Sequence, residues 1–412
     1  MGYGDVSVVA RSGEQPVGRA LLGLASSTPG LRRIRRPAAE GSPDFDLAYV
    51  RSGPRGLPPA VVIPGGPGLG SVLPYRGLRR LAASGGLDLV MVEHRGVGLS
   101  RRDTGGHDLP HSAMRVTDVV DDIAAVLDRE GIDSAFIVGS SYGSYLASSF
   151  GARHPDRVSG MLLDSALQST GDLEVERRVI RRLFWEEDSP IATEVRRLAE
   201  TDIDQRALLD VTRAAYEFGG ADLALPLLRQ RLRRRDPVWR ALESYATRDA
   251  SITRMPAIYE FDLVGTIGFR ELRYGPLPDG LPLDPALTYA PIADRFPGFA
   301  GEPFDLPALT PEFSWPMVLL SGDRDLRTPP AIAARVARTA REGVLVPIEN
   351  GHSALDTHPV ALLNALRWLI LGRQHQLPST AERLSNLPRR GTADLFARLL
   401  AAGLRLETTL LR

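Results

Sequence analysis

One short segment, AFIVGSSYGSYLASSFG at residues 135–151, constrains the fold more than any other part of the sequence. A run of β-branched and aromatic residues ends in the pattern G-x-S-x-G at residues 139–143, and a helix-forming stretch follows at once. Such a turn between a strand and a helix holds its central serine, Ser141, in a tight and strained bend beside the positive end of the helix. We therefore predict that Ser141 is a nucleophile; the alternative is a small-residue turn that serves only close packing.

Around this segment, short apolar runs bounded by Gly, Pro or Asp alternate with helical patterns, which indicates a mostly parallel sheet covered by helices on both faces. We predict a helix within residues 112–131 and strands at residues 46–51, 60–64, 88–93, 135–139, 161–164, 317–321 and 343–348. The alternation stops after residue 166 and resumes at residue 314. The interval, 167–313, has apolar residues three and four apart and is predicted to be a mainly helical lid, with 275–313 as a Pro- and Gly-rich loop.

The remaining part of the chain, 373–412, is predicted to be a polar linker followed by an amphipathic helix at 395–411. That helix has two alternative partners, the core of its own chain or a second subunit, and the second would make a homodimer. The α/β core is accordingly expected to comprise 1–166 and 314–372.

Composition excludes several classes of function. The chain of 412 residues carries 50 basic and 50 acidic side chains, so no bulk field attracts nucleic acid or an anionic membrane. It has no cysteine, which excludes disulfides, thiolate zinc sites and cysteine nucleophiles. No apolar run reaches membrane-spanning length and no convincing export signal precedes the first strand, so a cytoplasmic protein without metal or cofactor is expected.

A serine nucleophile needs a histidine base. Of the seven histidines, His352 and His358 follow the last predicted strand. His352 comes directly after an Asn-Gly pair, where a loop can turn the imidazole toward Ser141, whereas His358 precedes a proline that is expected to start a helix. We favour His352.

The base in turn needs a carboxylate, which fixes its tautomer and stabilises the imidazolium. The segment SGDRDLRTPP (321–330) follows a predicted strand and offers Asp323 and Asp325. Either one would give the order serine, acid, histidine that accompanies this type of turn, and the other would cap a helix or a turn.

An oxyanion hole is expected where the strand of VVIPGGPGLGS (61–71) ends in a glycine-rich loop. Such a loop can turn backbone N–H groups inward, and we predict that the amides of Gly66 and Tyr142 bind the developing negative charge. A glycine-rich loop could instead hold phosphate, but the chain has no lysine for a P-loop and no clean dinucleotide-binding pattern.

With these residues in place, the sequence resembles the α/β-hydrolase superfamily and, within it, the group of proline iminopeptidases and tripeptidyl aminopeptidases. The likeness is carried by PGGPG (64–68), EHRGVGLS (93–100), GSSYGSYLA (139–147), SGDRDLRTP (321–329) and GHS (351–353). The resemblance implies an α/β-hydrolase fold, a mostly parallel sheet flanked by helices, with a helical cap inserted after the sixth strand of that fold. It also selects Asp325 over Asp323, giving Ser141, Asp325 and His352 as catalytic residues.

Two positions depart from the pattern of the group, Pro64 in place of histidine and Glu93 in place of aspartate. Both are expected near the mouth of the site and therefore bear on the substrate. In the group, carboxylates of the cap bind the free amine of the substrate. The candidates here are Glu217, Glu260 and Asp262, with Glu271 further along; alternatively, these acids pair with the arginines of the cap on a solvated face.

The function expected from these features is that of a cofactor-independent serine hydrolase that releases N-terminal residues from short peptides or amides through an acyl-enzyme. The alternatives are an esterase, lactonase or thioesterase, an acyltransferase, and a ligand-binding protein with a silent site, because this fold hosts many functions.

Overall fold

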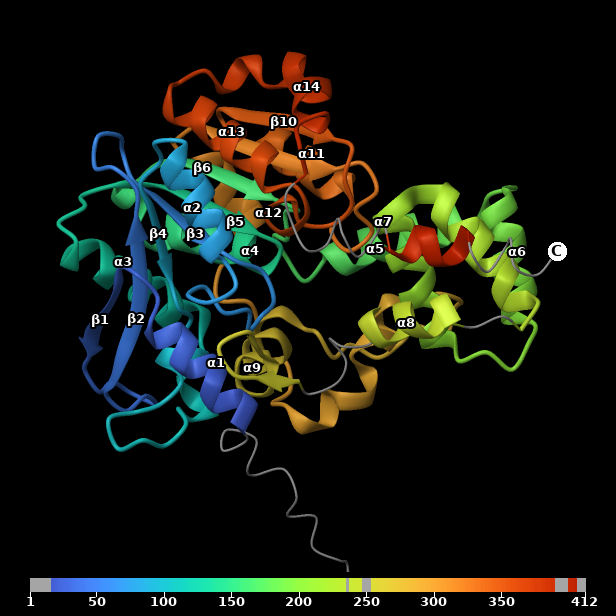
Figure 1. Ribbon diagram of the computed structural model, residues 1–412, viewed down its shortest axis with the longest axis horizontal. Helices are drawn as coiled ribbons and strands as arrows, with labels where there is room; N and C mark the ends of the chain where they lie inside the picture. The colour runs from blue at the N-terminus through green and yellow to red at the C-terminus, as the bar shows by residue number, and fades with distance from the viewer. Residues whose placement is uncertain (1–15, 235–236, 247–252, 390–398, 406–412) are drawn as a thin grey trace, which may run out of the picture.

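The computed structural model describes residues 16–234, 237–246, 253–389 and 399–405. Figure 1 shows a twisted sheet flanked by helices, with a group of helices standing to one side. The sheet has eight strands in the order β1-β2-β4-β3-β5-β6-β9-β10. They are β1 (Leu31–Arg36), β2 (Phe45–Ser52), β3 (Ala60–Ile63), β4 (Leu89–Val92), β5 (Ala135–Ser140), β6 (Val158–Asp164), β9 (Met317–Gly322) and β10 (Gly343–Ile348). Only β1 with β2 and β2 with β4 pair antiparallel, so the mostly parallel sheet of the prediction is confirmed.

Alternating side chains of the strands enter two apolar layers, one on each face of the sheet. On β3, Val61 and Ile63 belong to one layer, and Ala60 and Val62 belong to the other. The first layer is completed by helices α3 (Val116–Arg129), α4 (Tyr142–Arg153) and α11 (Pro330–Thr339), and the second by α2 (Arg76–Ser84), α13 (Pro359–Ile370) and α14 (Ala381–Ser385). A sheet buried on both faces explains the near-continuous apolar runs in its parallel strands.

All seven predicted strands are present, but β1 was not predicted. Its sequence, LRRIRR, has only two apolar residues and lacks the alternation that marks a half-buried strand. It forms because each of its residues pairs with β2, and its arginines find acids on neighbouring elements. Arg35 Nε lies 2.8 Å from Asp46, and Arg36 Nε lies 2.8 Å from Asp122 on α3.

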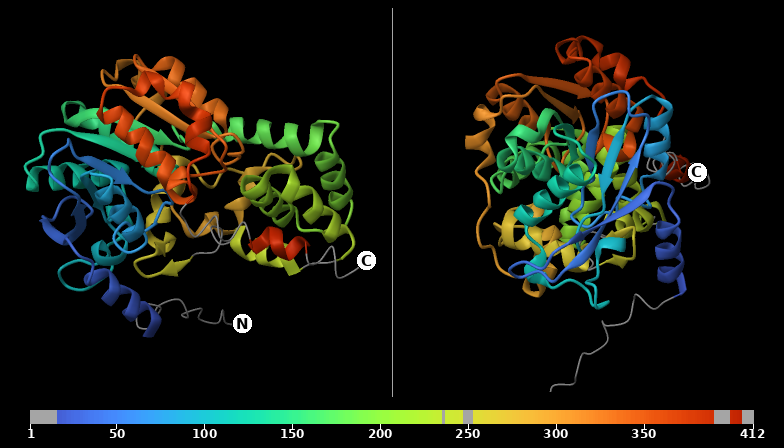
Figure 2. Two further views of the ribbon diagram at one scale, coloured as in Figure 1. Left: turned by 45° about the horizontal axis from the view of Figure 1, so that its top comes forward. Right: turned by 90° about the vertical axis from the view of Figure 1, so that its left-hand side faces the viewer.

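Residues 167–313, which we call the insert, leave the sheet after β6 and return at β9. Their larger helices are α5 (Asp172–Arg181), α6 (Pro190–Ala199), α7 (Gln205–Leu232), α8 (Pro237–Ala246) and α9 (Phe261–Leu272). Several of them share an apolar core of their own that includes Ile180, Phe184 and Trp239. Figure 2 shows that α5 to α8 stand beside the sheet, whereas α9 contributes Leu263, Val264 and Ile267 to the first apolar layer of the core. No helix within the described ranges is both long and apolar enough to cross a bilayer.

Two details of the insert differ from the prediction. Strands β7 (Arg254–Met255) and β8 (Tyr259–Glu260) form a small antiparallel hairpin ahead of α9. The stretch expected to be loop contains 3₁₀ turns at Pro285–Thr288 and Ala290–Arg295 and the short helix α10 (Leu306–Leu309). Pro285 is the first residue of the first turn and Pro291 the second residue of the other, positions that a helical turn accepts. Asp284 caps the first turn through the Ala286 N–H at 3.0 Å.

The segment after α13 is more ordered than a linker. Leu377 and Leu384, the latter on α14, are buried against the sheet. Of the helix predicted at 395–411, only 399–405 lie within the described residues, and these are helical. Leu400 and Leu404 belong to the apolar core of the insert, so this end of the chain docks on its own chain. A homodimer stays a prediction.

Candidate active site

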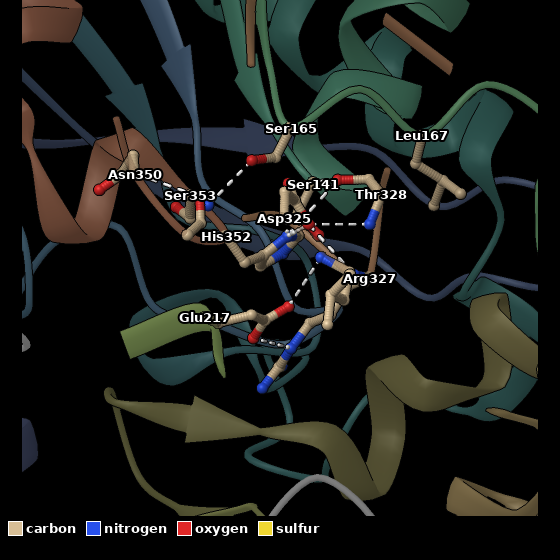
Figure 3. A network of polar contacts seen from close by, with 12 residues as sticks. Ser141, Ser165, Leu167, Glu217, Asp325, Arg327, Thr328, Asn350, His352 and Ser353 are labelled. Atoms are coloured by element: carbon tan, nitrogen blue, oxygen red, sulfur yellow. Dashed lines mark hydrogen bonds and ion pairs between the residues drawn. The ribbon is translucent and has the colours of Figure 1, made fainter. Parts of the chain in front are cut away.

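Four strands end at the same edge of the sheet, and the residues that follow them meet there. Ser141 follows β5, Asp164 ends β6, Asp325 follows β9 and His352 follows β10. Because β5, β6, β9 and β10 run parallel, their carboxyl ends lie side by side, which is where open α/β sheets place their binding sites. Figure 3 shows Ser141, Asp325 and His352 gathered at this edge.

Ser141 has φ 54° and ψ −123°, a backbone conformation that residues other than glycine seldom adopt. The two flanking glycines make this turn possible. A Cβ on Gly139 would lie 2.1 Å from the carbonyl oxygen of Gly143, and a Cβ on Gly143 would lie 2.2 Å from that of Ile63. The pattern therefore serves close packing, and the same packing exposes the Ser141 side chain to a cavity.

His352 is held by Asp325. Its Nδ1 lies 3.0 and 3.1 Å from the two carboxylate oxygens. Asp325 is fully buried and also accepts hydrogen bonds from the Thr328 N–H at 2.9 Å, the Thr328 hydroxyl at 2.8 Å and the Arg327 N–H at 3.1 Å. A carboxylate fixed on so many sides can orient an imidazole with little freedom left to either group.

The two groups shift each other's titration. Burial disfavours the charge of Asp325, but the His352 ring and the hydrogen bonds of Thr328 hold the pKa of the carboxyl below its ordinary value. Burial also acts against the imidazolium, yet the Asp325 carboxylate raises the pKa of His352 above the ordinary 6.5. The pair is therefore suited to stabilise an imidazolium that forms during a reaction.

The other candidates for the acid and the base lie elsewhere. Asp323 is half exposed and accepts the Asn350 N–H at 2.9 Å. His358 is buried at the start of α13 and contacts the Ser385 carbonyl oxygen at 3.2 Å through Nε2. Neither is among the described residues that line the cavity.

Ser141 and His352 line one cavity of about 330 Å³, formed between the sheet edge and the insert. Within the described part of the chain no hydrogen bond joins the Ser141 hydroxyl to the His352 ring. In enzymes without substrate, such bonds are often long and tighten only when the substrate is bound.

The glycine-rich loop passes directly against Ser141. A Cβ on Gly65 would lie 3.2 Å from the Ser141 Cβ, and both Gly65 and Gly66 line the cavity. Tyr142 is the first residue of α4, so its N–H has no acceptor within the helix. Gly66 thus lines the same cavity as Ser141, and Tyr142 follows the serine directly; that their amides bind an oxyanion stays a prediction.

The far end of this loop is held by Glu93, one of the two unusual positions. Its carboxylate accepts the Ser71 N–H at 2.5 Å and the Val72 N–H at 2.9 Å, while Arg79 donates to both carbonyl oxygens of the same residues. Burial raises the pKa of Glu93 to about 7. Glu93 therefore supports the loop from behind and does not face the cavity.

Glu260 and Asp262 are not brought to the cavity. Glu260 is buried and accepts the Ala257 N–H at 3.2 Å, and both carboxylates lie within 3.4 Å of Arg101. Neither is among the described lining residues, and Glu271 instead caps α3 through the Val116 N–H at 2.8 Å. Their expected role at a substrate amine is therefore not supported, because the first two pair with Arg101 away from the cavity and the third caps a helix.

Glu217 does line the cavity, together with an acid that the sequence analysis missed, Glu176 on α5. Glu217 accepts the Leu326 N–H at 3.2 Å and lies 3.2 Å from Arg327 Nε, and Glu176 lies 2.9 Å from Arg213. Burial raises the pKa of Glu176 to about 7, and nearby Glu217 adds to that effect against the opposing charge of Arg213. The helical spacing within DLEVERRVI indicates that one acid of this segment is buried, but it does not show that the acid faces the cavity.

Asp164, at the end of β6, was also missed and connects the nucleophile to the histidine loop. Its backbone oxygen accepts the Ser141 N–H at 2.9 Å. Its carboxylate accepts the Ser140 hydroxyl at 2.7 Å and the N–H groups of Ala354 and Leu355 at 3.0 and 2.9 Å. Burial raises the pKa of Asp164 to about 6. An aspartate directly after a strand, in LLDSAL, is the signal that could have pointed to it.

The fold and the serine turn define a class. The family model described as alpha/beta hydrolase fold matches residues 58–359, and the chain belongs to this family of hydrolases. The α/β-hydrolase fold of the prediction is thereby confirmed.

The individual curated relatives named here match only part of this chain. A "Probable proline iminopeptidase" from Leptolyngbya boryana is 31% identical over 120 residues, 28% of this chain and 34% of that protein. "Epoxide hydrolase B" from Mycobacterium tuberculosis is 34% identical over 80 residues, 19% of this chain and 21% of that protein. The chain thus matches about a third or less of the length of these curated relatives. The solved structure titled "Crystal structure of VinJ" has a TM-score of 0.50 and 17% identity, and the match covers 83% of this chain and 98% of that one. That likeness concerns the fold alone.

Proposed function

We propose that this protein is a cofactor-independent serine hydrolase that works through an acyl-enzyme formed on Ser141. The observation that carries the proposal is the placement of His352, oriented by buried Asp325, on the same cavity as the strained Ser141. A nucleophile and a base at one cavity, with a buried carboxylate behind them that orients the base, make up a site for acyl transfer.

In the proposed reaction the Ser141 oxygen attacks the substrate carbonyl carbon while its proton passes to His352 Nε2. The amides of Gly66 and Tyr142 bind the resulting oxyanion, and each such donor contributes about 3 kcal/mol in the transition state. The bond to the leaving group then breaks, and the leaving group takes the proton from His352. Water attacks the acyl-enzyme, its proton passes through His352 back to Ser141, and the acid product leaves.

We infer that the substrate is a short peptide or amide with a free N-terminus. Glu176 and Glu217 support this inference, because they bring two carboxylates to the wall of the cavity. Burial of an unpaired ammonium costs several kcal/mol, so a site for a free amine needs such partners. The similarity to a protein named as a probable proline iminopeptidase also supports this inference.

An ester, lactone or thioester is the second candidate substrate, and one observation favours it. Glu176 already pairs with Arg213, and Glu217 already pairs with Arg327. Neither carboxylate therefore needs the ammonium group of a substrate as its partner. In that case the part of the cavity between the two acids and the aromatic residues Tyr259, Tyr274 and Tyr289 would accept an uncharged acyl group.

A substrate panel separates the two candidates. Aminoacyl p-nitroanilides with a free amine would be compared with their N-acetylated forms and with p-nitrophenyl esters, in the wild type and in Ser141→Ala. For the peptidase, acetylation should abolish cleavage of the anilides. Equal rates with and without acetylation, together with a strong preference for esters, would exclude it. If a fluorophosphonate labels Ser141→Ala as well as it labels the wild type, the nucleophile is another residue.

A further inference from the structure

Guanidinium groups gather on the side of the cavity that carries His352. Arg324 and Arg327 belong to the loop after β9, and Arg389 follows α14; all three line the cavity. Arg327 lies 3.2 Å from the Glu217 carboxylate, while Arg389 donates to the Asn350 side-chain oxygen at 2.9 Å. The acids next to them, Asp323 and Glu349, lie toward solvent, with side chains 49% and 67% exposed.

Arg324 is the most weakly paired of these groups. Its Nη1 lies 3.6 Å from Asp323 and 3.6 Å from Glu349, beyond hydrogen-bond distance, and exposed pairs of this kind contribute little. In the described part of the chain its buried Nε has no hydrogen-bond partner. The Nε atoms of Arg101 and Arg213 have no hydrogen-bond partner among the described residues either, but their Nη atoms lie 2.8 and 2.9 Å from carboxylates. Among the same residues, Arg324 has no carboxylate at such a distance.

The side chain of Arg324 passes close to the insert at a glycine. Helix α7 is broken at Gly220, with φ 61° and ψ −153°, and the Cδ of Arg324 would lie 3.3 Å from a Cβ at that position. The Arg324 N–H donates to the Asn350 carbonyl oxygen at 3.0 Å, two residues before His352. The backbone of Arg324 is therefore tied to the histidine loop, while its side chain lies against the break in α7.

The position of His352 defines which part of the substrate reaches this side. In the proposed reaction His352 delivers a proton to the leaving amine, so the leaving group lies beside the histidine loop. Glu217 lies on this side as well, where its carboxylate offsets Arg327. The amine end of the substrate is therefore assigned to Glu176 on α5. A planar guanidinium with an unused Nε–H suits a carboxylate, which it can bind through two parallel hydrogen bonds.

We propose that Arg324 binds the free C-terminal carboxylate of the leaving amino acid or short peptide, so that the site selects zwitterionic di- and tripeptides over longer or amidated chains. This inference rests on the proposed peptidase function and adds a second charged end to its substrate. Arg327 and Arg389 add positive potential, and Asp323 and Glu349 oppose it from the solvent side. Because the charges are close to solvent, the selectivity weakens as ionic strength rises.

The test uses three substrates that share one N-terminal residue, the residue whose p-nitroanilide the wild type cleaves fastest. They are that anilide, the dipeptide with C-terminal alanine, and the same dipeptide with its C-terminus amidated. The wild type should prefer the free acid over the amide by about tenfold in kcat/KM, as expected for one charge-assisted contact. Arg324→Gln should remove this preference by lowering kcat/KM for the free acid about tenfold more than for the anilide and the amide, whereas Arg324→Lys should keep part of it.

Arg341→Gln is the matched control, because Arg341 is exposed and pairs with Glu312 on the surface. It should behave as the wild type. Equal rates for acid and amide in the wild type would overturn the carboxylate subsite while the anilide rate still supports the peptidase. A preference that persists in folded Arg324→Gln would overturn the assignment to Arg324. If no anilide is cleaved, the peptidase proposal fails and this inference fails with it.

Discussion

The two walls of the cavity are built in different ways. On the sheet side, backbone geometry fixes the important groups: Ser141 is held in a strained turn, and Asp325 is held by two backbone N–H groups and a hydroxyl. On the insert side, Glu176 is held by a side-chain ion pair with Arg213, whereas Glu217 is tied to the acid loop by the Leu326 N–H and by Arg327. The first wall therefore tolerates few changes, while Glu176 on the second wall can be altered without disturbing the turn, the acid or the histidine. We expect the reaction to depend on the first wall and the choice of substrate on the second.

The largest expected effect is on the sheet side, at Ser141. Ser141→Ala removes the nucleophile and should lower kcat by a factor of about 10⁴ to 10⁶ on every substrate, with KM little changed. Steady-state kinetics and fluorophosphonate labelling measure this effect. Ser112→Ala, at an exposed hydroxyl that bonds only to the Gly41 carbonyl oxygen, is the control. A comparable loss in the control, or activity retained in Ser141→Ala, would contradict the division between the walls.

The next effect is at the acid. Asp325→Asn should lower kcat by about 10⁴-fold, because an amide favours the wrong tautomer of His352. Asp323→Asn, in the same loop but facing solvent, should stay within about twofold of the wild type, as surface substitutions usually do. If the two variants lose equal activity, the loop matters as a whole and the carboxylate at 325 has no special role.

The insert side should respond to pH. Glu176, whose pKa is raised to about 7, must be ionised to attract an ammonium, so KM for free-amine substrates should rise as the pH falls below 7. It should rise again above about pH 8, where the substrate amine loses its proton. KM for an ester without an amine should show neither change. In Glu176→Gln the acidic arm of the profile should disappear, and KM should be raised about tenfold throughout. An unchanged acidic arm would assign it to another group.

The smallest expected effect lies within the sheet side, at Asp164, which links the strand of Ser141 to the histidine loop. Asp164→Asn keeps the shape but places an amide N–H₂ where backbone N–H groups need an acceptor. An unsatisfied buried donor costs about 1 to 3 kcal/mol of stability. We also expect kcat to fall about tenfold with KM unchanged, since the histidine loop loses its tie to the strand of Ser141. A lower Tm with full kcat in the folded protein would limit Asp164 to a structural role.

The sequence allowed the sheet side to be predicted because its signals are local. The turn at Ser141, the acid loop and the Asn-Gly-His exit each follow a strand, and the parallel strands bring them to one edge whatever the lengths between them. Strand β1 was missed because its mainly arginine sequence has no apolar alternation, and it is stabilised by pairing with β2 and by distant acids.

The insert side could not be predicted residue by residue. Glu217 and Glu260 have similar sequence surroundings, with an aromatic residue on each side. The structure places Glu217 at the cavity and turns Glu260 toward Arg101, on the other side of the hairpin. That difference depends on how α7 breaks at Gly220 and how the hairpin packs, which are properties of the tertiary structure. The periodicity of the sequence indicates that such acids lie on helices or turns. It does not show whether they face the cavity.

Strand β1 has a further consequence for how copies of this protein meet. It is the last strand on its side of the sheet, and within the described ranges only one of its edges is paired. An open edge is a template on which another polypeptide can add a strand. Here four of the six residues, Arg32, Arg33, Arg35 and Arg36, are arginines. Charged side chains along an edge strand oppose the addition of a further strand, so this border discourages fibril-like growth of the sheet from one molecule to the next.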